Sequence, residues 1–245
     1  MANPKQTKRV RAVAKALVVR GGWDGHEPVL CSDRLVPWLK NRGFEVTVSD
    51  TLDAYLDPAL MAGVRVIIPI WTMGEISGDQ FNALNQAVRA GVGLAGWHGG
   101  MCDAFRNNTE YQFMTGGQWV AHPGGVIDYR VTDLDPVDPI TATLAPFWIH
   151  SEQYYMHTDP GNEVLASTVF SGEHQGYTWF MGTKMPVVWK RTWGRGRVFF
   201  TSLGHVAADW NVPQAFEITK RGIQWAAGLE IVPEYTDPTS ACCAY

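Results

Sequence analysis

The amino-acid sequence predicts an α/β protein with a mostly parallel sheet and helices on both of its faces. Two observations indicate this class. Short apolar, often β-branched runs alternate with segments of helical spacing, and the order strand, helix, strand occurs twice in the first hundred residues. Because parallel strands need a connection that crosses the sheet, this alternation is typical of a parallel sheet covered by helices.

Four expected strands and two expected helices occupy these first hundred residues. The strands are the apolar runs at residues 15–20, 44–48, 64–70 and 92–97. The first helix, residues 29–42, has apolar side chains at helical spacing, although Pro37 disfavours an unbroken helix. The second helix, residues 77–90, begins after the capping residue Ser77 and stops at Gly91.

The chain changes character after the fourth strand. Residues 114–160 contain Gly-Gly and Asp-Pro steps, so we expect a loop-rich insertion above the sheet there and not a separate domain. Regular structure resumes with strands at residues 186–190 and 197–201, followed by a last helix over residues 213–227.

Length and composition limit the domain count and the function class. The 245 residues fit one large domain, expected over residues 15–228, between a basic lead of residues 1–14 and a tail of residues 229–245. An apolar fraction of 46% excludes a disordered chain, and a net charge of -4 argues against a nucleic-acid binder. No apolar run reaches the ~20 residues that cross a bilayer, so we expect no membrane partner. Without an export signal the expected location is cytoplasmic, and Cys242-Cys243 is expected to be a free-thiol tail.

Histidines directly follow three of the expected strands. These are His26, His98 and His205. Because the carboxyl ends of parallel strands meet at one edge of a sheet, where ligands bind, we expect the three side chains to share a site. His122 lies in a Pro-Gly turn that is expected to hang over the same edge. Imidazole suits both proton transfer near neutral pH and metal ligation.

His98 stands at the centre of residues 96–100, GWHGG, which have the G-x-[nucleophile]-x-G form of a strand-to-helix elbow. Small residues are needed on both sides because the central residue sits in a tight turn with its side chain pushed outward. Here the centre is a histidine, and Cys102 is too far along the chain to take its place. A thioester mechanism therefore has no nucleophile.

Residues 149–157 supply the expected carboxylate. Glu152 and Tyr154 share one face if this segment is extended, and Glu152 can orient an imidazole, act as a base or complete a metal site. His157 is a further binding candidate, and a solvated edge strand is the alternative. His26, His98 and His205 leave a divalent metal such as zinc open, although no H-E-x-x-H or Cys-x-x-Cys spacing commits the chain to one.

The chain contains 11 tryptophans, an unusual number. Trp23, Trp97 and Trp119 lie beside the histidine motifs, where their rings could stack on the C–H face of a sugar. A Trp-rich core or a homo-oligomer interface stays open as the alternative. No nucleotide cofactor is expected, because the chain has neither a G-x-G-x-x-G nor a Walker pattern.

Five motifs, in this order, resemble the ThuA-like, trehalose-utilisation family. They are GHEP at residues 25–28, GWHGG at 96–100, HPGG at 122–125, EQYY at 152–155 and GRGRVFFTSLGH at 194–205. The resemblance covers about residues 15–228. It implies a flavodoxin-like, three-layer α/β/α sandwich similar to that of class I glutamine amidotransferases. In those enzymes the elbow carries a cysteine, which His98 replaces here, while His205 is similar in placement to their triad histidine; we therefore expect no glutaminase.

The resemblance also implies catabolism of trehalose and related disaccharides, through 3-keto sugars that a partner dehydrogenase produces. We therefore expect a hydrolase, lyase or isomerase that acts on a keto-disaccharide by His/Glu chemistry. A 3-keto group acidifies the neighbouring C–H, so His98 or Glu152 would remove that proton, while His205 or His122 would protonate the leaving glycosidic oxygen. A bound metal ion would polarise the carbonyl. The alternative is a non-catalytic sugar-binding or regulatory module on an amidotransferase-like scaffold.

Overall fold

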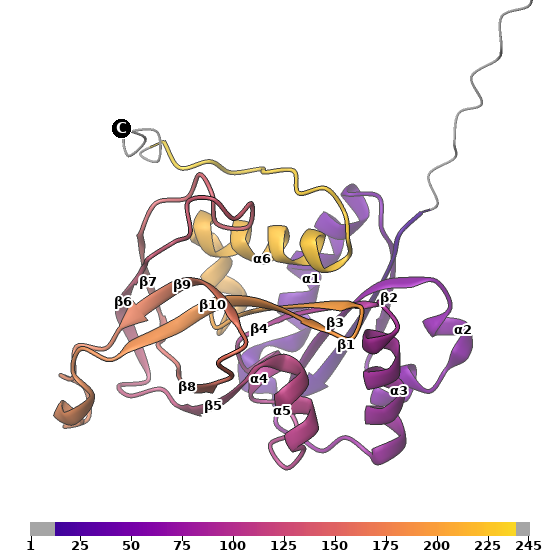
Figure 1. Cartoon of the computed structure of the whole chain (residues 1–245), viewed down its shortest axis with the longest axis horizontal. Coiled ribbons are helices and arrows are strands. Elements are labelled where there is room, and N and C mark those ends of the chain that lie inside the picture. Colours follow the sequence, from indigo (N-terminus) through magenta and orange to yellow (C-terminus); the bar gives the residue numbers. More distant parts are fainter. Residues whose placement is uncertain (1–12, 239–245) are drawn as a thin grey trace, which may run out of the picture.

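Strands and helices alternate through the first half of the chain, in a computed structural model that describes residues 13–238 (Figure 1). Every strand and helix expected there is present: β1 (Lys15–Gly22), α1 (Pro28–Asn41), β2 (Glu45–Ser49), β3 (Val64–Thr72), α3 (Gly78–Arg89) and β4 (Gly93–Trp97). Short elements lie between them: η1 (Asp24–His26), η2 (Leu52–Tyr55) and α2 (Pro58–Met61). Most of the basic lead and the Cys242-Cys243 pair lie outside the described residues.

The local signals for the two helices are visible in their structures. Ser77 Oγ accepts a hydrogen bond from the Gln80 backbone at 3.2 Å, and the Gln80 side chain accepts one from the Ser77 backbone at 2.9 Å, so a capping box starts α3. α1 runs through Pro37 without a break. Pro37 is exposed, so the helical carbonyl that loses its partner lies on the solvent side, where water can satisfy it.

The main sheet has nine strands in the order β2-β1-β3-β4-β11-β10-β9-β6-β7. Strands from the second half of the chain complete it: β11 (Gly196–Thr201), β10 (Lys184–Trp193), β9 (Glu163–Val169), β6 (Val126–Thr132) and β7 (Phe147–Glu152). Neighbours from β2 to β11 are parallel, and neighbours from β11 to β7 are antiparallel. The sheet is therefore mixed, and the parallel arrangement that the sequence predicts extends over one half of it.

Residues 114–160 are not the loop-rich insertion that the sequence predicts. They contain β6 and β7, which extend the main sheet, and β5 (Gly117–Ala121) and β8 (Tyr155–Thr158), which pair with each other. The turn residues that suggest loops instead connect short antiparallel strands. Strand propensity depends on neighbours that are remote in sequence, so short strands of this kind carry a weak local signal.

Helices cover both faces of the sheet and give three layers (Figure 1). α1 and α6 (Pro213–Ala226) pack on one face around core residues such as Leu35 and Ile218. The other face is covered by α3, α4 (His98–Cys102) and α5 (Thr109–Thr115), around core residues such as Leu84 and Met101. The α/β class is confirmed. None of the helices in residues 13–238 has the length and apolar character needed to cross a bilayer.

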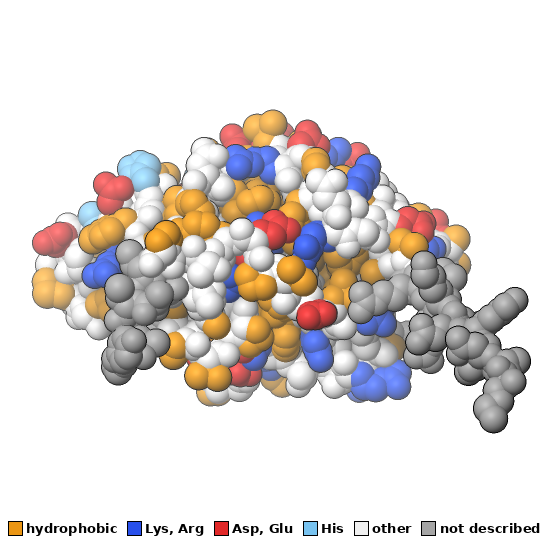
Figure 2. Space-filling model, turned by 90° about the horizontal axis from the view of Figure 1, so that it is seen from above, with side chains coloured by type: hydrophobic (Ala, Val, Ile, Leu, Met, Phe, Trp, Pro, Cys, Tyr) orange, Lys and Arg blue, Asp and Glu red, His pale blue; other side chains and the backbone are white. Residues whose placement is uncertain are grey.

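The described part of the tail, residues 229–238, is fixed to α6. Arg221 is fully buried, pairs with Glu217 at 2.8 Å and donates to the backbone carbonyls of Ala142 at 2.6 Å and Tyr235 at 2.7 Å. One guanidinium therefore holds the tail and the β6–β7 connection on the helix. Figure 2 shows the face of the molecule above α6, where acidic and basic side chains are interspersed among apolar ones.

Candidate functional site

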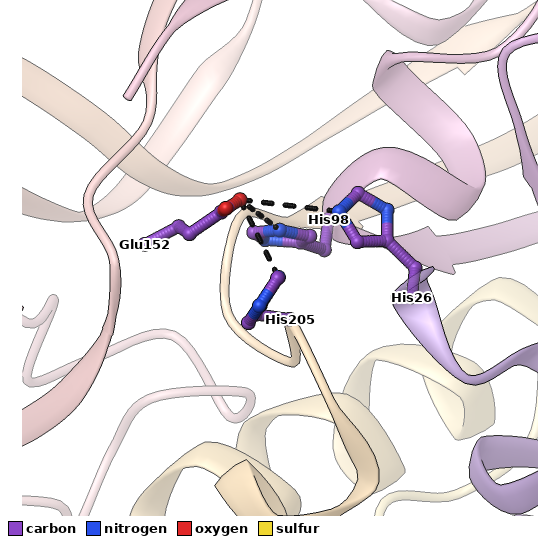
Figure 3. Close-up of side chains that lie close together, drawn as sticks. All are labelled: His26, His98, Glu152 and His205. Carbon is purple, nitrogen blue, oxygen red and sulfur yellow. Dashed lines mark hydrogen bonds and ion pairs between the residues drawn. The ribbon is translucent and has the colours of Figure 1, made fainter. Parts of the chain in front are cut away.

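The carboxyl ends of β1, β4 and β11 bring three histidines together (Figure 3). His26 ends η1 after β1, His98 begins α4 after β4, and His205 follows β11. Glu152, the last residue of β7, points at all three rings. One ligand atom from each of these four residues lies within 4.8 Å of the others. We call the four residues the His/Glu cluster.

The three imidazoles converge on one carboxylate oxygen. Oε2 of Glu152 lies 3.2 Å from His98 Nε2, 3.4 Å from His205 Nδ1 and 3.9 Å from His26 Nε2. His26, His98 and Glu152 are buried, and His205 is nearly so. Residues remote in sequence thus form one desolvated polar site, as the strand-end rule predicts for the histidines.

The backbone around His98 has the elbow geometry that its glycines indicate. His98 has a φ of 46°, in the left-handed region that side chains rarely adopt. A Cβ on Gly99 would lie 2.5 Å from the His26 ring, so only glycine lets His26 approach His98. The His98 ring also stacks on Tyr154 at a centroid distance of 3.9 Å.

Hydrogen bonding fixes which nitrogen of His98 faces the carboxylate. Its Nδ1 lies 2.7 Å from the backbone carbonyl of Ser202, which can only accept, so Nδ1 carries a proton and donates. In a neutral His98, Nε2 then presents a lone pair to Glu152 Oε2 at 3.2 Å. Two acceptors at this separation need a proton or a cation between them.

The electrostatics of the cluster favour neutral His26 and His205 beside an ionised Glu152. Burial, reinforced by the neighbouring histidines, lowers the pKa of His26 to about 3, and burial also lowers the pKa of His205. Burial alone would raise the pKa of Glu152, but the hydrogen bond with His98 and the surrounding imidazoles outweigh it and hold that pKa at about 2. His26 also meets the Thr72 hydroxyl through Nδ1 at 2.9 Å, which leaves Nε2 toward Glu152.

We predict that the metal-free protein loses stability as the pH falls from 6.5 to 4. The pKa of His26 is about 3 in the fold and 6.5 in the unfolded chain, so between these values the unfolded chain binds more protons and acidification favours it. The lowered pKa of Glu152 acts in the same direction below pH 4.5. Between pH 6.5 and pH 4 the free energy of unfolding is expected to fall by on the order of 3 kcal/mol.

Urea unfolding at a series of pH values checks this dependence. His26→Gln should flatten it, whereas His150→Gln, at an exposed position outside the cluster, should leave it unchanged. Equal unfolding free energies for the wild type at pH 6.5 and pH 4 would contradict the prediction.

His122 lies on the solvent side of the cluster. Its Nδ1 is 3.7 Å from the other carboxylate oxygen, Oε1 of Glu152, and 37% of its side chain is exposed. The ring centroids of Trp119 and His122 are 5.6 Å apart. Trp23 packs edge-on against His26, with a centroid distance of 4.8 Å. Glu152 therefore contacts three inner imidazoles through Oε2 and one outer imidazole, that of His122, through Oε1.

Two residues expected at the site lie elsewhere. Trp97 is 2% exposed and packs against Trp210 in the core, so it cannot stack on a sugar. It precedes His98 at the end of β4, and successive side chains of a strand point to opposite faces. His157 is exposed on β8, where it alternates with the buried Met156, and it contacts no member of the His/Glu cluster.

The residues that orient the cluster are not among those that the sequence motifs predict. Thr72 ends β3, the strand between β1 and β4, so the strand-end rule that found the histidines also covers it. Asp209 does not end a strand and stands in no motif, so the sequence does not point to it. Its Oδ2 accepts hydrogen bonds from Ser151 Oγ at 2.6 Å and from the His205 backbone at 2.9 Å, which ties the loop of His205 to the strand of Glu152.

A cavity of about 390 Å³ lies at the same edge of the sheet, beyond the end of β3. Its walls include Glu75, Phe105 and Asn107, but no member of the His/Glu cluster lines it. It therefore lies beside the cluster and not over it.

The family model ThuA, described as trehalose utilisation, matches residues 15–226. The chain belongs to the ThuA family. No curated protein is detectably similar to it in sequence. The match spans every strand and helix described above, including all residues of the His/Glu cluster.

Solved structures support the same fold for this ThuA protein. A ThuA-like protein from Bacteroides uniformis is 18% identical with a TM-score of 0.69, covering 91% of this chain and 94% of that one. Another, from Parabacteroides merdae, is 17% identical with a TM-score of 0.69, covering 90% and 93%. A β-galactosidase from Bacillus circulans is 13% identical with a TM-score of 0.52, covering 89% of this chain but 32% of that one. The expected likeness to glutamine amidotransferases stays a prediction.

Proposed function

We propose that this ThuA protein is an enzyme that acts on a keto-disaccharide or a related sugar derivative, and that its His/Glu cluster holds a divalent metal ion such as zinc. One observation carries the proposal. His98 Nε2 lies 3.2 Å from the Glu152 carboxylate while its Nδ1 is held by the Ser202 carbonyl, in a buried site that two further imidazoles complete. The family description, trehalose utilisation, supports a sugar as the substrate class.

The residues present fit a small divalent cation. A tetrahedral site with metal–ligand distances near 2.0–2.1 Å has ligand atoms about 3.3 Å apart. The contacts of Glu152 Oε2 with His98 and His205, at 3.2 and 3.4 Å, are close to this value, and the contact with His26 is longer at 3.9 Å. Hydrogen bonds to the outer nitrogens of ligating histidines are the usual means of orienting them, which Ser202 and Thr72 supply here. When bound, such an ion polarises a substrate carbonyl.

The outer side of the cluster is where we place proton transfer. Both ring nitrogens of His98 are engaged, by Ser202 and by Glu152, so His98 is better suited to holding the cation than to acting as a free base. His122 is partly exposed, and its Nδ1 lies 3.7 Å from Glu152 Oε1. We assign His122 the proton exchange with the C–H group next to the keto carbon. As the C–O bond breaks, the electron pair of the former C–H bond forms a C=C double bond next to the carbonyl, and the proton passes from His122 to the leaving glycosidic oxygen.

The experiment that tests this function measures metal content and turnover on the same preparation. We expect about one divalent ion per chain by elemental analysis, and conversion of 3-keto-trehalose that falls at least about 100-fold on chelation and returns with added metal. Full activity in metal-free protein would exclude the metal. Sugar binding without turnover of any keto-disaccharide would favour the binding module. The cytoplasmic location and a homo-oligomer stay predictions.

A further inference from the structure

Arg106 lies outside the His/Glu cluster but is joined to it by a continuous series of contacts. Its guanidinium carbon is 4.7 Å from the centroid of the Trp119 ring. That ring lies 5.6 Å from His122 and 6.2 Å from Tyr154, which stacks on His98. The side chains of Arg106 and His122 are 43% and 37% exposed, so both are accessible to solvent.

Asp103 fixes the orientation of this guanidinium. Arg106 Nε donates to Asp103 Oδ1 at 2.6 Å, and Nη2 donates to Oδ2 at 2.9 Å, which is the two-point geometry of a strong Arg–carboxylate pair. Asp103 is 2% exposed and directly follows α4, the helix that His98 begins. The arginine is therefore anchored to the element that carries the His98 elbow.

Arg106 and Trp119 each have a hydrogen-bond donor that no group in the described part of the protein accepts. Within residues 13–238, Arg106 Nη1 has no hydrogen-bond partner in the protein, and the buried Nε1 of Trp119 has none either. A buried indole N–H without an acceptor is costly and ordinarily finds a partner. Because the Asp103 carboxylate already neutralises the guanidinium, these donors carry little net charge, and their natural acceptors are the hydroxyl oxygens of a neutral sugar.

We propose that Arg106, held by Asp103 over Trp119, is a substrate-binding residue that donates hydrogen bonds to the hydroxyl oxygens of a neutral sugar ring beside His122. This inference rests on the proposed function and specifies its substrate as an uncharged saccharide. It also changes the role expected of Trp119, which supports the arginine with its ring.

Steady-state kinetics with 3-keto-trehalose and calorimetric titration with trehalose test the proposal. Arg106→Ala should raise KM and the trehalose Kd about 10-fold or more and change kcat less than about threefold, because the lost hydrogen bonds serve binding and not the proton transfer. Arg106→Lys should not restore KM, since an ammonium group keeps the charge but loses the planar fork. The matched control is Arg195→Ala, at an exposed turn on the opposite edge of the sheet.

Arg106→Ala also leaves Asp103 buried without its partner, so the double variant Asp103→Asn/Arg106→Ala is measured alongside it. The same rise in KM in both variants supports the proposal. An unchanged KM and Kd in the folded double variant overturns it and leaves the proposed function intact. Tighter binding of a glucuronic-acid disaccharide than of trehalose overturns the neutral-sugar assignment. A wild type that neither binds nor converts these sugars overturns the proposed function and this inference with it.

Discussion

Replacing Glu152 by Gln is expected to lower kcat/KM by about 10³-fold or more while the protein stays folded. Glu152 contacts all four imidazoles of the site, three through Oε2 and His122 through Oε1. Gln has the same shape but no negative charge. It cannot balance the charge of a cation among the inner imidazoles, and it leaves His122 without a carboxylate neighbour at Oε1.

The measurement pairs turnover with thermal unfolding of metal-free protein. The unfolding midpoint of Glu152→Gln should stay within a few degrees of the wild type, because the Gln amide, unlike the carboxylate, can donate to His205 Nδ1, which lacks a hydrogen-bond partner. Glu173→Gln, at an exposed position in the β9–β10 connection, is the matched control and should keep full activity. Activity in Glu152→Gln above a tenth of the wild-type level would show that the carboxylate is neither ligand nor proton partner.

Replacing His98 by Ala should also abolish turnover, with kcat/KM lower by about 10³-fold, and leave sugar-induced thermal stabilisation in place. The variant loses the ring that joins the Ser202 carbonyl to Glu152. The proposed sugar contacts lie on Arg106 and Trp119 and are retained. Loss of sugar binding together with activity would place the ligand directly on His98 and contradict the assignment.

A second variant separates the chemistry of His98 from its backbone strain. Because His98 has a φ of 46°, Ala is strained at this position and Gly is not. His98→Gly should therefore be more stable than His98→Ala by about 1 kcal/mol in urea unfolding, while both are equally inactive. If His98→Gly recovers activity, the elbow serves only to shape the backbone.

Several features of this protein follow from local sequence alone. The Ser77 capping box, the glycines after the helices and the apolar runs of the first hundred residues predict the four strands β1 to β4 and the two longer helices α1 and α3, but not the short elements η1, η2, α2 and α4. The rule that ligands gather at the carboxyl ends of parallel strands also groups His26, His98 and His205 correctly. These signals succeed because capping, turn chemistry and strand burial act between residues that are close together in the chain.

Other features were decided only by tertiary structure. The part of the antiparallel half that residues 114–160 form joins the main sheet through the pairing of β6 with β9, two strands that are not consecutive in the chain. Trp97 is buried because its side chain lies on the face of β4 that packs against α1 and α6. The turn residues that follow it do not indicate which face that is. The hydrogen bonds of Thr72, Ser202 and Asp209 join segments remote in sequence. The sequence by itself determined which groups could react, whereas long-range packing decided which of them meet and which nitrogen each one presents.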